Sequence, residues 1–516
     1  MKYRISHAAF CVAFPLVLFA ACNAVNFGKF ATWFASGDGV DATGLAAYLL
    51  AGLCLFIASF TLLAHRWTIK PFAILLAVAS GAATYFIAKY GIAVDSSMIL
   101  NVVHTDRTEV GQLLSWRMWP YVAFLAVVPG AAVLCADIRF APGARYLLSS
   151  ATLLIGALAM AVAALYLEYN SVIRAGNVSR KYIVYSLVPV NLLSASLNAG
   201  YKSLKPRLAS TRTPEVRGRV ASGDDLVVVL AIGESSRSRN FSLYGYARRN
   251  TNPLLGRVED LHALQGVARR GSTLNALPEI LVKSGIRLPA LAAGLGIPTA
   301  CYVNYTLYDN CDGVGEVKAS GCGHGGTCYD EDVIPLLEKD LRGYRHGKRL
   351  VVLHLGGGSH GPVYSDRYPP EFRRFRPLCD EADVANGCTL EELYNAYDNT
   401  ILYVDHVLAG LLQALDGSGA PYVFMYLSDH GESLMEEGRM FHGMPPGIAL
   451  PPEQAEVPLL VKASVPVSIV PRGEYAQPDV FDTVLDLLSI ESPDLDGRGS
   501  FVRLRPGAQL QAGGEP

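Results

Sequence analysis

The chain has 516 residues, of which 51% are hydrophobic and 17% are charged. That length excludes a single small domain, and so high an apolar content excludes a protein that is water-soluble throughout. The formal net charge is −2 at pH 7, so the chain lacks the basic excess that binds nucleic acid by counterion release. We therefore expect a membrane part, a globular part and no nucleic-acid partner.

The apolar residues of the first third gather into five stretches. Each is near the roughly 20 residues that a helix needs to cross a ~30 Å hydrocarbon core, and the fourth is the shortest. After the fifth stretch no apolar run of that length follows, which predicts a five-helix transmembrane domain over residues 1–170. The stretches are Ala8–Ala24, Gly44–Ala64, Pro71–Ala93, Tyr121–Cys135 and Leu147–Leu167.

The loops between these stretches indicate the orientation of the chain, because Lys and Arg beside a span stay in the cytoplasm. One set of loops carries Arg4, Arg66, Lys70, Arg139 and Arg145, whereas the other set mixes cations with acidic residues. This places the N-terminus inside and the large C-terminal part outside. The basic start and the Phe-Ala-Ala-Cys sequence before residue 23 also fit a lipoprotein leader, but four further spans favour a retained anchor.

Cysteine positions give an independent indication of the compartment. Four cysteines lie within the spans, and the other six lie between residues 301 and 388 in close pairs. Six cysteines allow 15 pairings, of which near-neighbour disulfides are the simplest in an oxidising compartment. A zinc cluster is the alternative, although none of the spacings is Cys-x-x-Cys. The expected disulfides are Cys301–Cys311, Cys322–Cys328 and Cys379–Cys388.

Residues 171–223 have the composition of an interfacial helix and a linker. Tyr182–Leu197 is apolar enough to lie on a membrane surface, and Lys202–Gly223 is rich in Pro, Arg, Ser and Gly. A globular catalytic domain is expected over residues 224–503, and a disordered tail over residues 504–516.

Within the globular part, short β-branched runs alternate with helical patterns such as Glu391–Leu415. The runs are Leu226–Ile232, Leu350–His354, Tyr422–Leu427 and Val457–Val461. Continuous apolar runs of this length are typical of strands buried on both faces. The pattern predicts an α/β domain around a mostly parallel sheet.

Acidic residues and histidines follow the carboxyl ends of these strands, where α/β sheets bind ligands. Glu234 follows the first run, Asp429 and His430 follow the third, and His360 follows a glycine run after the second. His442 lies further along. Any one of these alone is an ordinary polar residue at a strand end, but several ends that converge favour a Zn²⁺ or Mn²⁺ site.

Longer motifs surround the same positions. They read Ile232-Gly-Glu-Ser-Ser-Arg237, Asn240-Phe-Ser-Leu-Tyr-Gly-Tyr246, Asn252-Pro253, Ser359-His-Gly-Pro362, Arg367-Tyr-Pro-Pro-Glu-Phe372, Asn395-Ala-Tyr-Asp-Asn-Thr400, Ser428-Asp-His-Gly-Glu-Ser433 and His442-Gly-Met-Pro445. Together they resemble the phosphoethanolamine transferases that modify lipid A, including the mobile colistin-resistance enzymes. The resemblance covers nearly the whole chain. It implies five transmembrane helices followed by a periplasmic α/β domain of the alkaline phosphatase/sulfatase type, anchored in the bacterial inner membrane.

The resemblance also implies roles for the strand-end residues. Glu234, Asp429 and His430 would bind a catalytic Zn²⁺. His360 and His442 would contact the phosphoryl group or the leaving oxygen, or hold a second zinc ion.

A loop outside the membrane between the third and fourth spans resembles the family's substrate-contacting segment. Its residues Asn101, Thr105 and Glu109 recur every four positions, so on a helix they share one face. Such a face would hold an ethanolamine ammonium through Glu109.

The nucleophile segment departs from the family pattern, which is Ser-Cys-Gly-Thr-Ala-Thr-Ala with the first Thr as nucleophile. Here the stretch reads Arg270-Gly-Ser-Thr-Leu-Asn-Ala-Leu-Pro278, without the cysteine. Thr273 aligns with the nucleophile and would also be a zinc ligand, and Ser272 is the fallback. The glycine run before Ser359 is also longer than in the family, which could shift His360.

The implied activity is transfer of phosphoethanolamine from phosphatidylethanolamine to a lipopolysaccharide acceptor, a lipid A phosphate or a core sugar. The resemblance implies that a covalent phospho-Thr intermediate would form at the zinc site. The alternatives are a phosphoglycerol transferase or sulfatase-like phosphodiesterase on the same fold, and a catalytically inactive relative.

Overall fold

The computed structural model divides the chain into two compact units. The membrane unit consists of Met1–Ala209 and Met435–Ala449, and the α/β unit of Ser210–Leu434 and Leu450–Pro516. The residues described are 3–35, 42–104, 111, 114, 116–170, 184–208, 218–304, 307–319, 329–356, 358–381, 383–444, 448–495 and 497–505.

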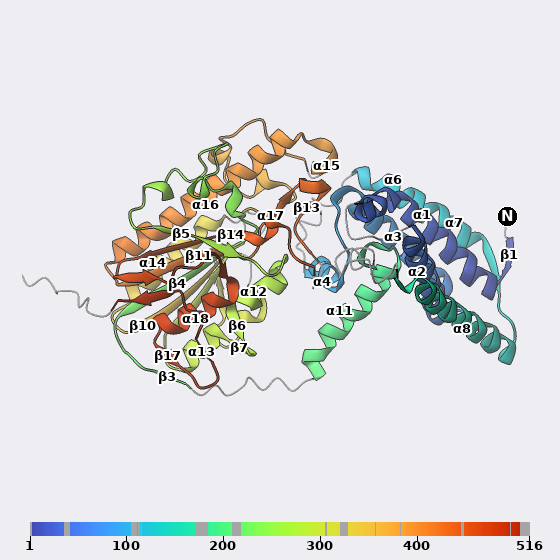
Figure 1. Ribbon diagram of the computed structural model, residues 1–516, viewed down its shortest axis with the longest axis horizontal. Coiled ribbons are helices and arrows are strands. Elements are labelled where there is room, and N and C mark those ends of the chain that lie inside the picture. Colours follow the sequence, from blue (N-terminus) through green and yellow to red (C-terminus); the bar gives the residue numbers. More distant parts are fainter. Residues whose placement is uncertain are drawn as a thin grey trace, which may run out of the picture. The chain divides into compact units, whose positions relative to one another are not determined.

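Long apolar helices form the membrane unit (Figure 1), and five segments in its described part are long and apolar enough to cross a bilayer. Four are the single helices α1 (His7–Ala35), α2 (Ala42–Leu63), α3 (Ile69–Tyr90) and α8 (Gly143–Leu167). The remaining one joins a 3-10 turn (Trp116–Met118), α6 (Trp119–Val122), a π-helical turn (Ala123–Val127) and α7 (Val128–Cys135).

The composite span begins at Trp116, whereas the sequence predicted a start at Tyr121. Pro120 lies in the first turn of α6, where the amide that proline lacks would have no helical partner. The helix can therefore start upstream of the apolar run, with its two tryptophans in the first turns.

Shorter elements complete the membrane unit. A parallel pair joins β1 (Tyr3–Ser6) to β2 (Ala136–Arg139), and α4 (Ser96–His104) packs against α11 (Val190–Leu208). The segment that comes from late in the sequence contains β13 (Met440–Phe441), and the Phe441 ring stacks on Tyr90 of α3 at 5.3 Å.

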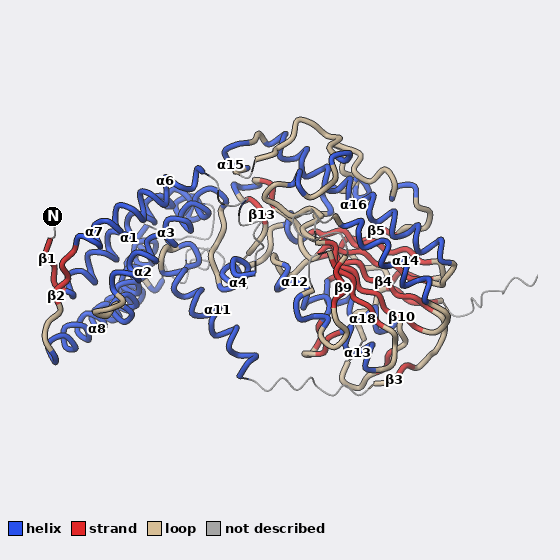
Figure 2. Tube along the Cα trace, turned by 180° about the vertical axis from the view of Figure 1, so that it is seen from behind, coloured by secondary structure: helices blue, strands red, loops and turns tan. Residues whose placement is uncertain are grey.

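An eight-stranded sheet forms the centre of the α/β unit (Figure 2). Its strand order is β16-β5-β14-β11-β4-β10-β8-β9. Within the described residues, β14 runs antiparallel to both of its neighbours, β5 and β11. The strands are β4 (Leu226–Gly233), β5 (His262–Val267), β8 (Thr299–Val303), β9 (Glu316–Lys318), β10 (Lys348–Leu355), β11 (Tyr422–Ser428), β14 (Glu456–Ala463) and β16 (Tyr475–Ala476).

Helices cover both faces of this sheet (Figure 1). One face packs its apolar side chains against α12 (Thr273–Leu281), α13 (Leu288–Gly294) and α18 (Gln477–Leu487). The opposite face carries α14 (Ile334–Gly343) and the long α16 (Leu390–Ser418), which pack together. The strands are thus buried on both sides, which accounts for their continuous apolar sequences.

The remaining elements are short. Ser284 and Gly285, both with positive φ, form the two-residue turn between β6 (Val282–Lys283) and β7 (Ile286–Arg287). The others are β3 (Arg219–Val220), β12 (Ser433–Leu434), β15 (Val467–Ile469), β17 (Ile490–Glu491), β18 (Val502–Leu504), α15 (Val384–Gly387) and α17 (Pro452–Ala455).

The predicted fold class is confirmed: apolar helices come first, and an α/β domain follows. All four predicted strands and the helix now seen as α16 are present. The prediction did not include β5, β8, β9 and β16, because short or mixed sequences lack a clear period.

Candidate active site

The site begins where two neighbouring parallel strands end. Gly233 closes β4, and a Cβ at this position would collide with the ring and hydroxyl of Tyr426 on β11, so the packing of this tyrosine over the strand end requires glycine. The Asp429 amide donates to the Gly233 carbonyl at 3.0 Å. This bond places Glu234 and Asp429 side by side although 194 residues separate Asp429 from Ser235.

Glu234, Asp429 and His430 form a buried cluster whose ligand atoms all lie within 4.8 Å of one another. His430 Nε2 lies 3.2 Å from Asp429 Oδ2 and 3.5 Å from Glu234 Oε1. The Nδ1 of His430 lies 3.0 Å from the Gly431 carbonyl, which fits a ring that donates there and turns the Nε2 lone pair toward the carboxylates. Two carboxylates and one imidazole are a donor set that suits Zn²⁺.

The buried carboxylates of this cluster need a cation to balance their negative charge. Burial, followed by repulsion from Glu234, raises the pKa of Asp429 to about 7. Asp429 Oδ2 is buried and accepts no hydrogen bond within the described residues. A buried acceptor without a donor costs free energy, and a metal ion would satisfy it, so these residues fit the group that the sequence implies.

Thr273 lies beside this cluster at the first position of α12, after the extended residue Ser272. Its hydroxyl donates to Glu234 Oε2 at 2.8 Å and lies 3.5 Å from His430 Nε2. Ser272 accepts a hydrogen bond from Asn275 Nδ2 at 2.9 Å instead. Of the two candidate hydroxyls, the one on Thr273 is therefore the one in contact with the cluster.

His360 reaches the same cluster from the loop after β10. Its Nδ1 lies 3.6 Å from Glu234 Oε1 and 3.4 Å from the Ser235 hydroxyl. The neighbouring Ser359 amide donates to the Glu234 carbonyl at 3.1 Å. The longer glycine run thus leaves His360 beside the glutamate.

Sequence reasoning missed a hydroxyl network beneath these residues. Ser235 adopts a left-handed backbone, with φ of 56°, and its hydroxyl donates to Glu234 Oε1 at 2.8 Å. Tyr397 of α16 donates to the Ser235 carbonyl and accepts from the Arg237 amide. Both residues lie in motifs that stood out in the sequence, but no spacing rule relates them.

The remaining predicted site residues belong to the membrane unit or lie outside the described residues. His442 belongs to the segment Met435–Ala449 of the membrane unit. Asn101 lies on α4, which ends at His104, and the side chain of Asn101 is outside the described part. Thr105 and Glu109 lie outside the described residues.

Two of the three expected disulfides are present. Cys301–Cys311 links β8 to the turn that follows it, and Cys379–Cys388 closes a loop before α16. The third pair, Cys322–Cys328, lies outside the described residues.

The fold and the site together define a membrane-bound enzyme of the sulfatase type, in which a hydroxyl lies next to a candidate metal centre. Two family models match the chain accordingly. The one described as "Phosphoethanolamine transferase EptA/EptB" matches residues 52–204, and the one described as "Sulfatase" matches residues 291–490.

Full-length relatives extend the match. The chain is 33% identical over 507 residues to phosphoethanolamine transferase EptA of Escherichia coli, which covers 87% of each chain. It is 26% identical over 552 residues to phosphatidylethanolamine transferase Mcr-1 of Escherichia coli, covering 97% of this chain and 98% of Mcr-1. The solved structure of the integral membrane enzyme EptA from Neisseria meningitidis superposes with a TM-score of 0.80 at 24% identity, covering 96% of this chain and 98% of that one.

The chain therefore belongs to the phosphoethanolamine transferase family. It is a phosphoethanolamine transferase whose described part contains five helical segments long and apolar enough to cross a membrane. With the N-terminus in the cytoplasm, as the loop charges predict, α8, the last span before the α/β unit, begins at the cytoplasmic side of the membrane and ends at the opposite side.

Proposed function

We propose that the protein transfers phosphoethanolamine from phosphatidylethanolamine to the lipid A or Kdo region of lipopolysaccharide. The names of its relatives support both substrates: Mcr-1 is a phosphatidylethanolamine transferase, and a Salmonella typhimurium relative, 25% identical over 541 residues, is a Kdo(2)-lipid A phosphoethanolamine 7''-transferase. A membrane anchor suits a reaction in which donor and acceptor are both lipids.

Four residues, Glu234, Thr273, Asp429 and His430, would hold a catalytic Zn²⁺. The orphaned oxygen of Asp429 and the mutual distances of the cluster support this assignment. When bound, zinc lowers the pKa of a hydroxyl and offsets the charge that develops on phosphoryl oxygens.

Thr273 is the nucleophile in this proposal, and the contact between its hydroxyl and Glu234 carries the assignment. In the first half-reaction Oγ1 bonds to the donor phosphorus, and the bond from phosphorus to the diacylglycerol oxygen breaks. Glu234 Oε2 is placed to hold the proton that leaves Thr273, and the diacylglycerol oxygen takes up a proton as it departs. Phosphoethanolamine is then esterified to Thr273.

In the second half-reaction an acceptor oxygen bonds to the phosphorus, and Thr273 Oγ1 leaves and regains a proton. His360, at the rim of the cluster with 18% of its side chain exposed, is placed to take the acceptor proton. His442 is the second candidate for this role, and with His360 it is a candidate holder of a second zinc ion. Asn101, Thr105 and Glu109 are proposed to bind the ethanolamine part of the donor.

Substitution of the nucleophile tests the proposal in the full-length protein. Thr273→Ala should reduce transfer from ethanolamine-labelled phosphatidylethanolamine by at least about 10³-fold, as is usual for loss of a covalent nucleophile. Ser272→Ala is the matched control, since it removes a hydroxyl one residue away that bonds only to Asn275 in the described structure, and it should keep most of the activity.

Mass spectrometry of tryptic peptides identifies the residue that carries phosphoethanolamine independently. We expect a phosphoethanolamine adduct on Thr273 when acceptor is withheld. An adduct on Ser272, or transfer by Thr273→Ala at the wild-type rate, would show that the nucleophile is assigned wrongly. Mass spectrometry of lipopolysaccharide from cells with and without the protein identifies the acceptor.

A further inference from the structure

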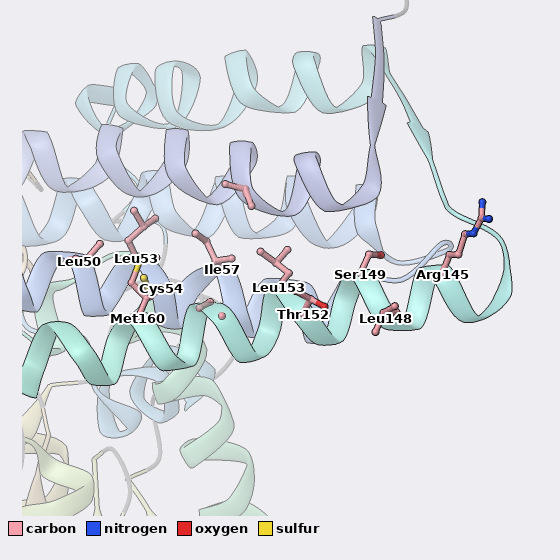
Figure 3. Close-up of a pocket in the computed structure, with 13 residues that line it drawn as sticks. Leu50, Leu53, Cys54, Ile57, Arg145, Leu148, Ser149, Thr152, Leu153 and Met160 are labelled. Carbon is pink, nitrogen blue, oxygen red and sulfur yellow. The ribbon is translucent and has the colours of Figure 1, made fainter.

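A groove runs along the membrane unit between α1, α2 and α8 (Figure 3). Its volume is about 850 Å³, and its walls are apolar side chains such as Val12 of α1, Leu53 and Ile57 of α2, and Leu153 and Met160 of α8. Val12 is 37% exposed and Met160 54% exposed. The groove therefore opens outward from the helices rather than lying inside the bundle.

Small residues on α8 create the groove. Ala157 and Ala161 let α8 approach Ala51 and Ala58 of α2 closely. Gly156 then leaves its position empty, because a Cβ there would meet no atom within 4 Å. The gap therefore results from the sequence of α8, and it has room for a longer side chain or for part of a ligand.

The lining of the groove changes from apolar to positively charged at its cytoplasmic end. Arg145, in the first turn of α8, lines that end (Figure 3). Its side chain is exposed and makes no ion pair or side-chain hydrogen bond in the part of the chain that the structure describes. Arg66 and Lys70 line a neighbouring hollow of about 570 Å³ on the same side, with Asp137 as the acidic residue there. A positive potential therefore surrounds the mouth of an apolar groove.

We propose that this groove binds one acyl chain of an anionic phospholipid from the cytoplasmic leaflet, with the lipid phosphate paired to Arg145. The hydrocarbon core holds no water to fill an apolar gap, so an acyl chain is the group available to restore the lost packing contacts. Anionic headgroups are enriched in that leaflet and attract exposed Lys and Arg at its surface.

The dimensions agree with this occupant. From Leu148 to Met160 the α8 axis rises about 18 Å at 1.5 Å per residue, close to the half-thickness of a ~30 Å core. The groove thus has the depth of one leaflet, and the charge of Arg145 lies at the level of the lipid headgroups. This lipid is distinct from the donor, because its headgroup lies at the cytoplasmic end of α8, whereas catalysis is periplasmic.

Native mass spectrometry of the full-length protein tests the proposal, after equilibration in mixed micelles with equal amounts of phosphatidylglycerol and phosphatidylcholine that carry the same acyl chains. The wild type should retain one phosphatidylglycerol molecule, about fivefold in preference to phosphatidylcholine, because the phosphatidylglycerol headgroup keeps a net negative charge whereas the choline cation neutralises the phosphate of phosphatidylcholine. Arg145→Gln should abolish the preference. Gly156→Leu should abolish retention of both lipids, and the milder Gly156→Ala should reduce it.

Arg4→Gln is the matched control, because it removes a cation from the same side of the membrane that does not line the groove. It should leave the preference unchanged, and all four variants should keep their transferase activity. An unchanged preference in Arg145→Gln, or unchanged lipid retention in Gly156→Leu, would overturn the proposal. So would a wild-type spectrum dominated by a lipid-free dimer, since a second copy would then occupy the face.

Discussion

Removal of the metal should make the stability of this enzyme depend on pH in a direction set by Asp429. The pKa of this carboxyl is raised to about 7 because it is buried and lies beside Glu234. A raised pKa means that the folded state holds the proton more tightly than the unfolded chain, whose pKa is near the ordinary value of 3.8. The resulting stabilisation is complete below that ordinary value and is lost as the pH rises through about 7.

The magnitude follows from the two pKa values. A shift of about 3 units is worth roughly 4 kcal/mol in total, and about 2 kcal/mol of it is lost between about pH 5.5 and about pH 8. Asp405 is also buried, and its pKa is raised to about 6, so the wild type has a second contribution of the same sign at lower pH. Comparison of the wild type with Asp429→Asn isolates the contribution of Asp429.

The assay is calorimetric unfolding of the full-length, chelator-treated protein in detergent at both pH values. The metal-free wild type should unfold several degrees lower at the higher pH, whereas Asp429→Asn should lack that part of the shift. All four tryptophans lie within the first 119 residues, so their fluorescence reports on the membrane part separately.

Added zinc should distinguish the wild type from Asp429→Asn. Added zinc should stabilise the wild type more strongly at the higher pH, because the ligands must be deprotonated, and should leave Asp429→Asn nearly unchanged. If metal-free Asp429→Asn showed the same pH dependence as the wild type, the electrostatic account of the cluster would be refuted.

Three other substitutions test separate features. Ser235→Gly suits the left-handed backbone but removes the hydroxyl that orients the neighbouring glutamate, so zinc affinity measured by titration should fall about 10–100-fold, and an unchanged affinity would exclude this orienting role. Arg248→Ala leaves the fully buried carboxylate of Asp398 without its cation and should cost about 3–5 kcal/mol in the free energy of unfolding, whereas a cost below about 1 kcal/mol would contradict the buried ion pair. Cys301→Ala removes the disulfide to Cys311 and should lower the free energy of unfolding by about 2–4 kcal/mol, measured in buffer without reductant. Equal melting temperatures for the wild type and Cys301→Ala would contradict this expectation.

Much of the fold can be predicted from the sequence because the patterns that specify it are local. A run of apolar residues long enough to cross a bilayer has few alternatives to a helix, and all five predicted spans overlap those of the structure, with ends such as Gly143 and Trp116 shifted by a few residues. The same holds for β4, β10 and β11, whose continuous apolar sequences reflect burial on both faces.

The candidate metal ligands were also predictable, because the carboxyl ends of parallel strands meet at one edge of a sheet. Glu234 and Asp429 follow two such strands, and the structure makes those strands direct neighbours. Their roles remain a proposal, but their proximity followed from strand positions alone.

Other features depended on contacts between distant segments. The hydroxyl of Thr273, rather than that of Ser272, contacts Glu234 because α12 begins at that residue and packs against α18. The strained turn at Ser235 and the support it receives from Tyr397 of α16 are equally invisible to periodicity.

The sequence by itself thus determined which segments cross the membrane, which apolar runs form the strands β4, β10, β11 and β14, and which carboxylates follow strand ends, since these depend on local hydrophobicity and strand length. Only the tertiary structure decided which hydroxyl meets the carboxylates, that residues 435–449 join the membrane unit, and that Gly156 leaves a groove beside α2. Those outcomes depend on how whole elements pack together, and packing is set by the shapes of side chains that lie far apart in the chain.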